Sequence, residues 1–245
     1  MIPALKSEFR KIFTVRSTWV ILALATAFGS VLIGFWIFGY KDVADAKTHA
    51  DALLASVLTA AGVSGVILSF IMLLLVGHEY RYSTIMYSLT SSASRSRVFF
   101  AKLLAGSAIV LLFGMIVVAL NFALFALGQN LNPEANMAQQ IAFGDVAWRL
   151  AVSFIGSALF AFAIAMLLRN QIASIAVILL MPATVEGLLG LLLKDNVKYL
   201  PFTALGNITA SSPKPEPLFS LVVVGVYAVV LGVLSWLLFV RRDAN

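Results

Sequence analysis

Six long stretches of apolar residues, nearly free of charge, constrain this chain more than any other feature. They lie at about residues 18–40, 53–77, 103–128, 147–168, 172–193 and 218–240. An uncharged apolar run of about 18 residues or more can cross the hydrocarbon core of a bilayer as a helix, which satisfies its own backbone hydrogen-bonding groups. Only 11% of the 245 residues are charged, against roughly 25% in a soluble domain. The sequence therefore predicts a single all-α membrane domain, residues 1–245, with six transmembrane helices.

The positions of lysine and arginine predict the orientation of these spans. With the N terminus in the cytoplasm, 11 of the 17 basic residues flank the spans on the inner side and 6 on the outer side. Basic residues are enriched in cytoplasmic loops, so we expect both termini inside and a location in the bacterial inner membrane. The net charge of +6 is accounted for by topology and by contacts with anionic lipids, and it does not indicate a nucleic-acid partner.

The tail at residues 1–17 has a pattern of its own. Apolar side chains at helical spacing occupy one face, and basic side chains occupy the rest of the surface: Leu5, Phe9, Ile12 and Phe13 against Lys6, Arg10 and Lys11. This pattern is typical of a short amphipathic helix that lies in the headgroup region. The alternative is an ordinary positive flank of the first span.

Residues that would carry catalysis or hold a metal are scarce. The chain has no cysteine and two histidines, and His78-Glu79 lacks the second histidine of a zinc-protease motif because Tyr82 stands there. There is no phosphate-binding loop of the GxxxxGK[ST] type. We expect no enzyme activity, metal or cofactor in this chain; any ATP and magnesium would be bound by a partner.

Two polar residues inside apolar runs are candidates for an intramembrane role. Glu186 follows Pro182 in the fifth span, and Asn121 lies in the third. A carboxylate within a membrane is costly and often functional, so Glu186 is a candidate for transport chemistry; the alternative is a hydrogen bond to a neighbouring helix or loop. The nearby segment 197–208 is apolar but too short to span, which leaves two options, a re-entrant piece and a plain outer loop.

The loop after span two is the longest on the cytoplasmic side and mixes charged, aromatic and hydroxyl residues. Its middle, Ser83–Leu89, is predicted to form a short helix with one apolar face, made of Ile85, Met86 and Leu89. That face would be offered to a cytoplasmic partner. The alternative is an interfacial loop with aromatic anchors.

This loop resembles the cytoplasmic loop of ABC-2-type ABC transporter permeases. The run that carries the resemblance is Glu79-Tyr80-Arg81, Thr84-Ile85, Leu89-Thr90, Ser94-Arg95 and Lys102-Leu103-Leu104. The basic N-terminal helix, the six spans and the Leu200-Pro201 segment in a long final outer loop are also similar to that family, most closely to small antibiotic- and sodium-export permeases. Ser83 stands where the family often has glycine, and no proline precedes Ser94-Arg95.

The resemblance implies a function in which two permease copies, or two homologous permeases, form the transmembrane pathway. Separate ATP-binding subunits would dock on the cytoplasmic side, with residues 79–97 as the coupling segment. The residues that would contact the ATPase are Glu79, Arg81, Thr84, Ile85, Leu89 and Arg95, with Glu79 and Arg81 setting the docking geometry. The uniformly apolar spans suit export of a lipophilic or amphipathic compound, and they equally suit contact with lipid.

Two other classes of function stay open from the sequence. A secondary transporter needs ionisable residues near the membrane midplane, and only Glu186 approaches this. A non-transporting scaffold or assembly factor would have neither an ATPase partner nor a substrate.

Overall fold

The computed structural model describes residues 2–39, 46–90, 94–131, 143–210 and 213–241, and these ranges contain helices and no strands. The main helices are α1 (Ile2–Thr14), α2 (Arg16–Gly39), α3 (Ala46–Arg81), α4 (Ile85–Thr90), α5 (Arg95–Leu131), α6 (Phe143–Leu168), α7 (Gln171–Leu180), α8 (Gly187–Leu193), α9 (Pro201–Ile208) and α10 (Pro217–Arg241). The predicted end of the first span at residue 40, and residues 91–93 of the coupling segment, lie outside the described ranges.

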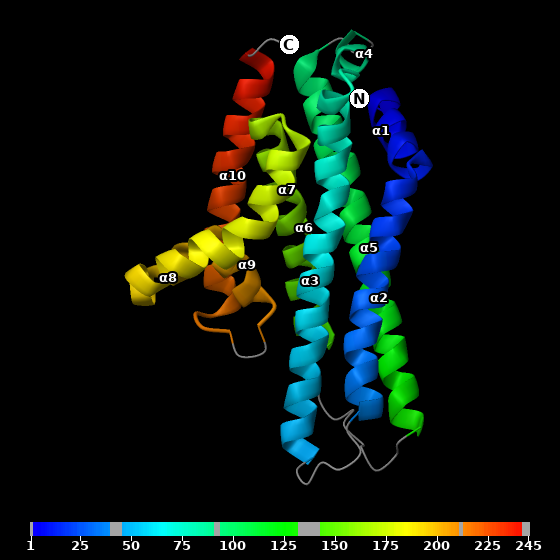
Figure 1. Ribbon diagram of the computed structural model, residues 1–245, viewed down its shortest axis with the longest axis vertical. Coiled ribbons are helices and arrows are strands. Elements are labelled where there is room, and N and C mark those ends of the chain that lie inside the picture. The colour runs from blue at the N-terminus through cyan, green and yellow to red at the C-terminus, as the bar shows by residue number, and fades with distance from the viewer. Residues whose placement is uncertain (1, 40–45, 91–93, 132–142, 211–212, 242–245) are drawn as a thin grey trace.

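Six helical segments are long and apolar enough to cross a membrane, which confirms the predicted fold class. They are Arg16–Gly34, Val57–Arg81, Arg95–Leu124, Val146–Leu168, Gln171–Tyr199 and Pro217–Arg241. The chain is a multi-pass membrane protein. The start of α1, the end of α10 and α4 lie at the same end of the bundle (Figure 1). That this end faces the cytoplasm stays a prediction from the charge pattern.

Helix α3 is the centre of the bundle and packs against α2, α5, α6 and α7. Its 36 residues are about 54 Å long at 1.5 Å per residue, so α3 extends well beyond a hydrocarbon core of about 30 Å. Glycines on α3 and α5 leave space for the buried ring of Phe154, which belongs to α6. A Cβ on Gly114 would lie 2.5 Å from the ring of Phe154, and one on Gly65 would lie 3.0 Å from it. These glycines therefore allow close packing of the three helices.

The fifth span is bent where the sequence predicts one continuous segment, 172–193. Helix α7 ends at Leu180, and Met181–Glu186 form a π-helical turn that contains Pro182. Proline has no N–H to donate to the preceding turn, and irregular turns of this kind bend a helix. Beyond the bend, α8 points away from the bundle (Figure 1), and Leu191 and Leu192 are about four-fifths exposed.

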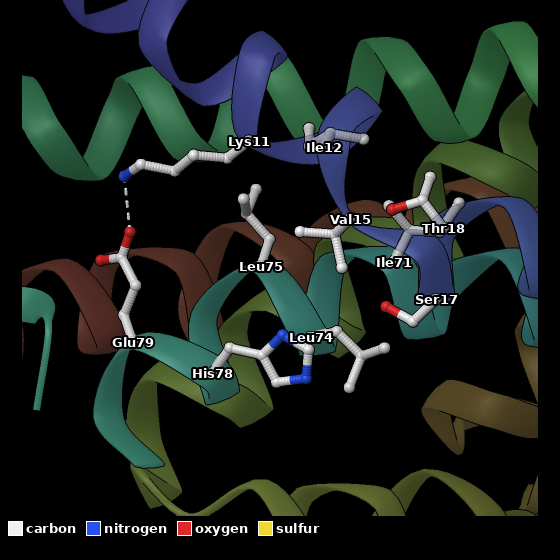
Figure 2. Close-up of a pocket in the computed structure, with 10 residues that line it drawn as sticks. All are labelled: Lys11, Ile12, Val15, Ser17, Thr18, Ile71, Leu74, Leu75, His78 and Glu79. Carbon is white, nitrogen blue, oxygen red and sulfur yellow. Dashed lines mark hydrogen bonds and ion pairs between the residues drawn. The ribbon is translucent and has the colours of Figure 1, made fainter. Parts of the chain in front are cut away.

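The N-terminal helix α1 meets α2 at a bend at Val15, the one residue between the two helices. The inner face of α1 carries buried Glu8 and Ile12. Under the bend, residues of α1, α2 and α3 line a partly open pocket of about 140 Å³ (Figure 2). The tail is therefore a helix, as predicted, and it packs on the bundle. Its position at a membrane surface stays a prediction.

Candidate functional site: an ion cluster at the base of the α4 loop

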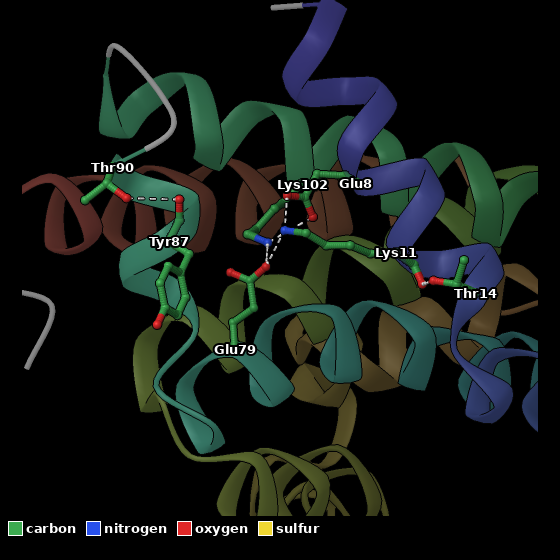
Figure 3. Close-up of polar contacts among 7 residues, drawn as sticks. All are labelled: Glu8, Lys11, Thr14, Glu79, Tyr87, Thr90 and Lys102. Carbon is green, nitrogen blue, oxygen red and sulfur yellow. Dashed lines mark hydrogen bonds and ion pairs between the residues drawn. The ribbon is translucent and has the colours of Figure 1, made fainter.

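Four charged side chains from three helices meet at the end of the bundle that carries α4 (Figure 3). The Lys102 ammonium lies 2.6 Å from Glu79 Oε1 and 2.9 Å from Glu8 Oε2. The Lys11 ammonium lies 2.6 Å from the same Glu79 oxygen and 2.8 Å from Glu8 Oε1. We call Glu8, Lys11, Glu79 and Lys102 the ion cluster.

Most of the ion cluster is shielded from solvent. The side chain of Lys102 is fully buried, those of Glu8 and Glu79 are 5% and 9% exposed, and that of Lys11 is 37% exposed. A buried charge is tolerated when it is paired and hydrogen-bonded. The two ammonium and two carboxylate groups balance one another in charge, and each carboxylate contacts both ammonium groups.

The ion cluster links three parts of the chain that are distant in sequence. Glu8 and Lys11 come from α1, one helical turn apart; Glu79 comes from the last turn of α3, and Lys102 from the early part of α5. The α4 loop connects α3 to α5, so Glu79 and Lys102 lie on its two stems. The cluster thereby ties the base of this loop to the N-terminal helix.

Within the ion cluster, the pKa of Lys11 is raised above its usual value of 10.5. Partial burial opposes the charge, but the hydrogen bonds that the Lys11 ammonium donates to Glu79 and Glu8, together with the negative charges of these two residues, outweigh that effect. Lys11 is therefore charged throughout the physiological range.

This raised pKa predicts how the contribution of Lys11 to stability depends on pH. Because the folded pKa is above the unfolded one, the contribution is complete below about pH 10.5 and is lost as the pH rises through the folded value. Thermal unfolding in detergent should show wild type more stable than Lys11→Met by a constant margin from pH 7 to pH 10. A margin that disappears well below pH 10.5 would contradict the raised pKa.

Helix α4 presents a different face from the one predicted. Ile85 is 3% exposed, and Leu89 packs against the core, so these two residues anchor α4 to the bundle. Met86 points away from them and is 48% exposed, together with Tyr82 at 64% and Tyr87 at 76%. The prediction that Ile85, Met86 and Leu89 form one outward face was wrong; the outward face is Tyr82, Met86 and Tyr87, which we call the α4 surface.

The other predicted contact residues do not gather at one place. Arg81 is exposed, with its guanidinium 5.5 Å from the ring centre of Tyr82. Thr84 is exposed, and its backbone N–H donates to the Glu79 carbonyl. Arg95 donates to the Val240 carbonyl at the end of α10, 3.2 Å away, where a positive charge complements the helix dipole. Of the predicted set, Arg81 and Thr84 remain on the surface, whereas Glu79 is buried in the ion cluster.

Glu186 binds the start of helix α9. Its Oε1 accepts the N–H of Phe202 at 2.9 Å, and its Oε2 accepts the N–H and the hydroxyl of Thr203 at 2.6 and 2.7 Å. A carboxylate at a helix N terminus satisfies free N–H groups and complements the dipole. Of the two alternatives for Glu186, this geometry favours the hydrogen bond to a neighbouring helix.

The opposite end of α9 is held by Arg149, which the sequence did not single out. Its Nε donates to the Ile208 carbonyl at 2.7 Å, and its Nη2 donates to the Ala210 carbonyl. Helix α9 forms within the ambiguous segment 197–208 and packs on α6 and α10, with Ala204, Leu205 and Ile208 buried. Protein therefore covers this short helix, the condition for a re-entrant piece.

Asn121, the weaker intramembrane candidate, is 2% exposed, and its Oδ1 has no hydrogen-bond partner among the described residues. A Cβ on Gly29 of α2 would lie 2.4 Å from the Asn121 amide nitrogen. Gly29 thus makes room for this side chain between α2 and α5, and the contact is one of helix packing.

Three members of the ion cluster were not identified from the sequence as site residues. The signals are visible afterwards: Glu8 is the one acidic residue in the tail, and Lys102 lies in the apolar segment Arg95–Leu124. A charged residue inside an apolar helix needs a partner. The sequence does not say which of the acidic residues that partner is.

Comparisons with known proteins bear on the family of the chain and leave its function open. A search of curated proteins finds no match. A model of a family described as "Protein of unknown function (DUF2705)" matches residues 22–244, which include most of the first span, all of the other five spans and two members of the ion cluster, Glu79 and Lys102. Because the match covers most of the sequence, the chain belongs to the DUF2705 family.

Proposed function

We propose that this chain is the permease subunit of an ATP-driven ABC exporter of the ABC-2 type, located in the bacterial inner membrane. Two copies, or two homologous permeases, form the pathway, and separate ATP-binding subunits bind the end of the bundle that carries α4. The exported compound is lipophilic or amphipathic. The chain contributes no ATPase site of its own.

The observation that carries this proposal is the α4 surface. Tyr82, Met86 and Tyr87 are exposed just beyond the end of the second span, and Met86 and Tyr87 lie on the short helix α4, which Ile85 anchors. Exposed tyrosine and methionine are typical of contact surfaces between proteins, and an apolar side chain that faces water gains from being covered by a partner. A groove on an ATP-binding subunit is the partner that the resemblance implies.

The ion cluster explains how a force on α4 reaches the spans. Glu79 and Lys102 lie on the two stems of the loop. Lys102 binds Glu8 of α1 directly, and Glu79 is linked to Glu8 through Lys11 and through Lys102. Closure of the ATP-binding subunits would move α4 and, through the cluster, α1, α3 and α5 together. Glu79 then transmits motion inside the bundle, and the contact with the ATPase is made by the α4 surface and Arg81.

The backbone at Ser83 adds support. Its φ is 54°, in the left-handed region that glycine adopts without a steric penalty. This is the position at which the permeases that the loop resembles often have glycine.

The proposal predicts that Tyr87→Ser weakens binding to an ATP-binding subunit. An aromatic anchor at the centre of an interface contributes roughly 2 kcal/mol or more, so we expect binding to weaken by about thirtyfold. The proposal predicts that a chain with the Walker A motif is encoded beside this one. That chain is the partner to co-express, and the measurement is its co-purification at graded concentrations.

The matched control is Tyr199→Ser, the same substitution at an exposed tyrosine outside the α4 surface. It should leave co-purification unchanged. If Tyr87→Ser binds as wild type does, or if no ATP-binding chain binds the wild-type protein, the proposed coupling surface is wrong.

A further inference from the structure

The lining of the pocket under the bend between α1 and α2 is half apolar and half polar, and the polar residues are Lys11, Ser17, Thr18, His78 and Glu79. Its walls include Ile12, Val15, Ile71, Leu74 and Leu75. Figure 2 shows Ser17 from α2 and His78 from α3 extending toward the same space, on the side away from the Lys11–Glu79 pair. A ligand for this pocket therefore combines a hydrocarbon segment with a polar group of small size.

The Ser17 hydroxyl indicates what that polar group is. Its oxygen is buried and has no hydrogen-bond partner among the described residues. Leaving a buried hydroxyl unpaired costs free energy, so such groups normally find a partner. A hydroxyl and an imidazole N–H both donate hydrogen bonds, and an acceptor placed between them would satisfy Ser17.

The position of the pocket along the membrane normal indicates which hydrogen-bond acceptor occupies it. Ser17 is the second residue of the span Arg16–Gly34, and His78 lies three residues before the end of Val57–Arg81. Both side chains therefore lie where the hydrocarbon core meets the headgroups. The acceptors of the bilayer at this depth are the ester carbonyls that join glycerol to the acyl chains.

We propose that this pocket binds the glycerol-ester region of a membrane phospholipid. Ser17 and His78 donate hydrogen bonds to an ester carbonyl, and the first methylenes of that acyl chain pack on Ile71 and Leu74. The volume of about 140 Å³ is close to that of a cavity which holds one benzene molecule, so it takes the ester group and its neighbouring methylenes. Exposed Arg16, beside Ser17, is placed to bind the phosphate.

The pocket also shares Lys11 and Glu79 with the ion cluster. A lipid bound there fills the space between α1 and α3 and supports the contact that the cluster makes. This role as a site for a structural lipid does not depend on the proposed export function.

The test compares two lipids that differ only in the proposed recognition group. The purified full chain is titrated with dioleoyl phosphatidylglycerol and with its diether analogue, which has the same headgroup and chains without ester carbonyls, and bound lipid is counted by native mass spectrometry. We expect the diester to bind at least about fivefold more tightly, the ratio given by one of the two hydrogen bonds alone. Ser17→Ala and His78→Phe should each reduce this preference, and together they should abolish it.

A second pair of variants tests the location. Ser17→Leu fills the pocket and should lower diester binding at least fivefold. Ala23→Leu, the same gain of size at an exposed position of the same helix, should not. Size-exclusion profiles identify any variant that fails to fold, in which case Ser17→Ala decides. Equal binding of the two lipids by wild type, or equal effects of Ser17→Leu and Ala23→Leu, would overturn the proposal.

Discussion

Lys102→Met is expected to destabilise the protein by about 3–5 kcal/mol, the usual cost of removing one partner from a buried ion pair. Met keeps the apolar part of the lysine side chain but removes the fully buried ammonium that binds Glu8 and Glu79. Two carboxylates then share the partly exposed Lys11. Equilibrium unfolding in mixed micelles measures the change in the free energy of unfolding.

The control for this prediction is Lys6→Met, the same substitution at an exposed position of α1, which should change stability by less than about 0.5 kcal/mol. The double variant Lys102→Met/Glu79→Gln removes one positive and one negative charge, and it should recover part of the loss. Equal stability of Lys102→Met and Lys6→Met would show that the ion cluster does not hold α1 to the bundle.

Glu186→Gln is expected to release the start of α9. The carboxylate accepts three hydrogen bonds from Phe202 and Thr203, whereas the glutamine amide has one acceptor oxygen and turns its NH₂ group toward a donor. Each charge-assisted hydrogen bond contributes about 1.5–3 kcal/mol, so we expect local opening to become about 10- to 100-fold more frequent. Hydrogen exchange of a peptide that covers 200–208 measures this opening.

Glu216→Gln is the matched control, because Glu216 is an exposed acid in the segment between α9 and α10. Hydrogen exchange of residues 200–208 in this variant should equal that of the wild-type protein. The prediction fails if Glu186→Gln also leaves exchange unchanged. A faster exchange in Glu186→Gln with intact helical content would establish that Glu186 positions α9 rather than carrying a transported ion.

The sequence correctly predicted two short helices from the local pattern of apolar residues. The apolar face of the tail predicted the helix Ile2–Thr14, and the loop after span two predicted a short helix that the structure places at Ile85–Thr90. The face that α4 presents was predicted wrongly. Periodicity groups Ile85, Met86 and Leu89, but the bundle below α4 determines that Ile85 and Leu89 turn inward and leave Met86 outside.

The sequence by itself determined the six apolar spans, because hydropathy and length are local properties that a bilayer selects without reference to tertiary contacts. Only the tertiary structure decided the partners of the charged residues. Lys102 lies 23 residues from Glu79 and 94 from Glu8, and no local pattern encodes contacts at such separations. It likewise decided that Glu186 binds α9, since that contact requires the bend at Pro182 to bring the end of the π-helical turn to Phe202. A buried charge must be paired, but which charge pairs with it depends on how the helices pack.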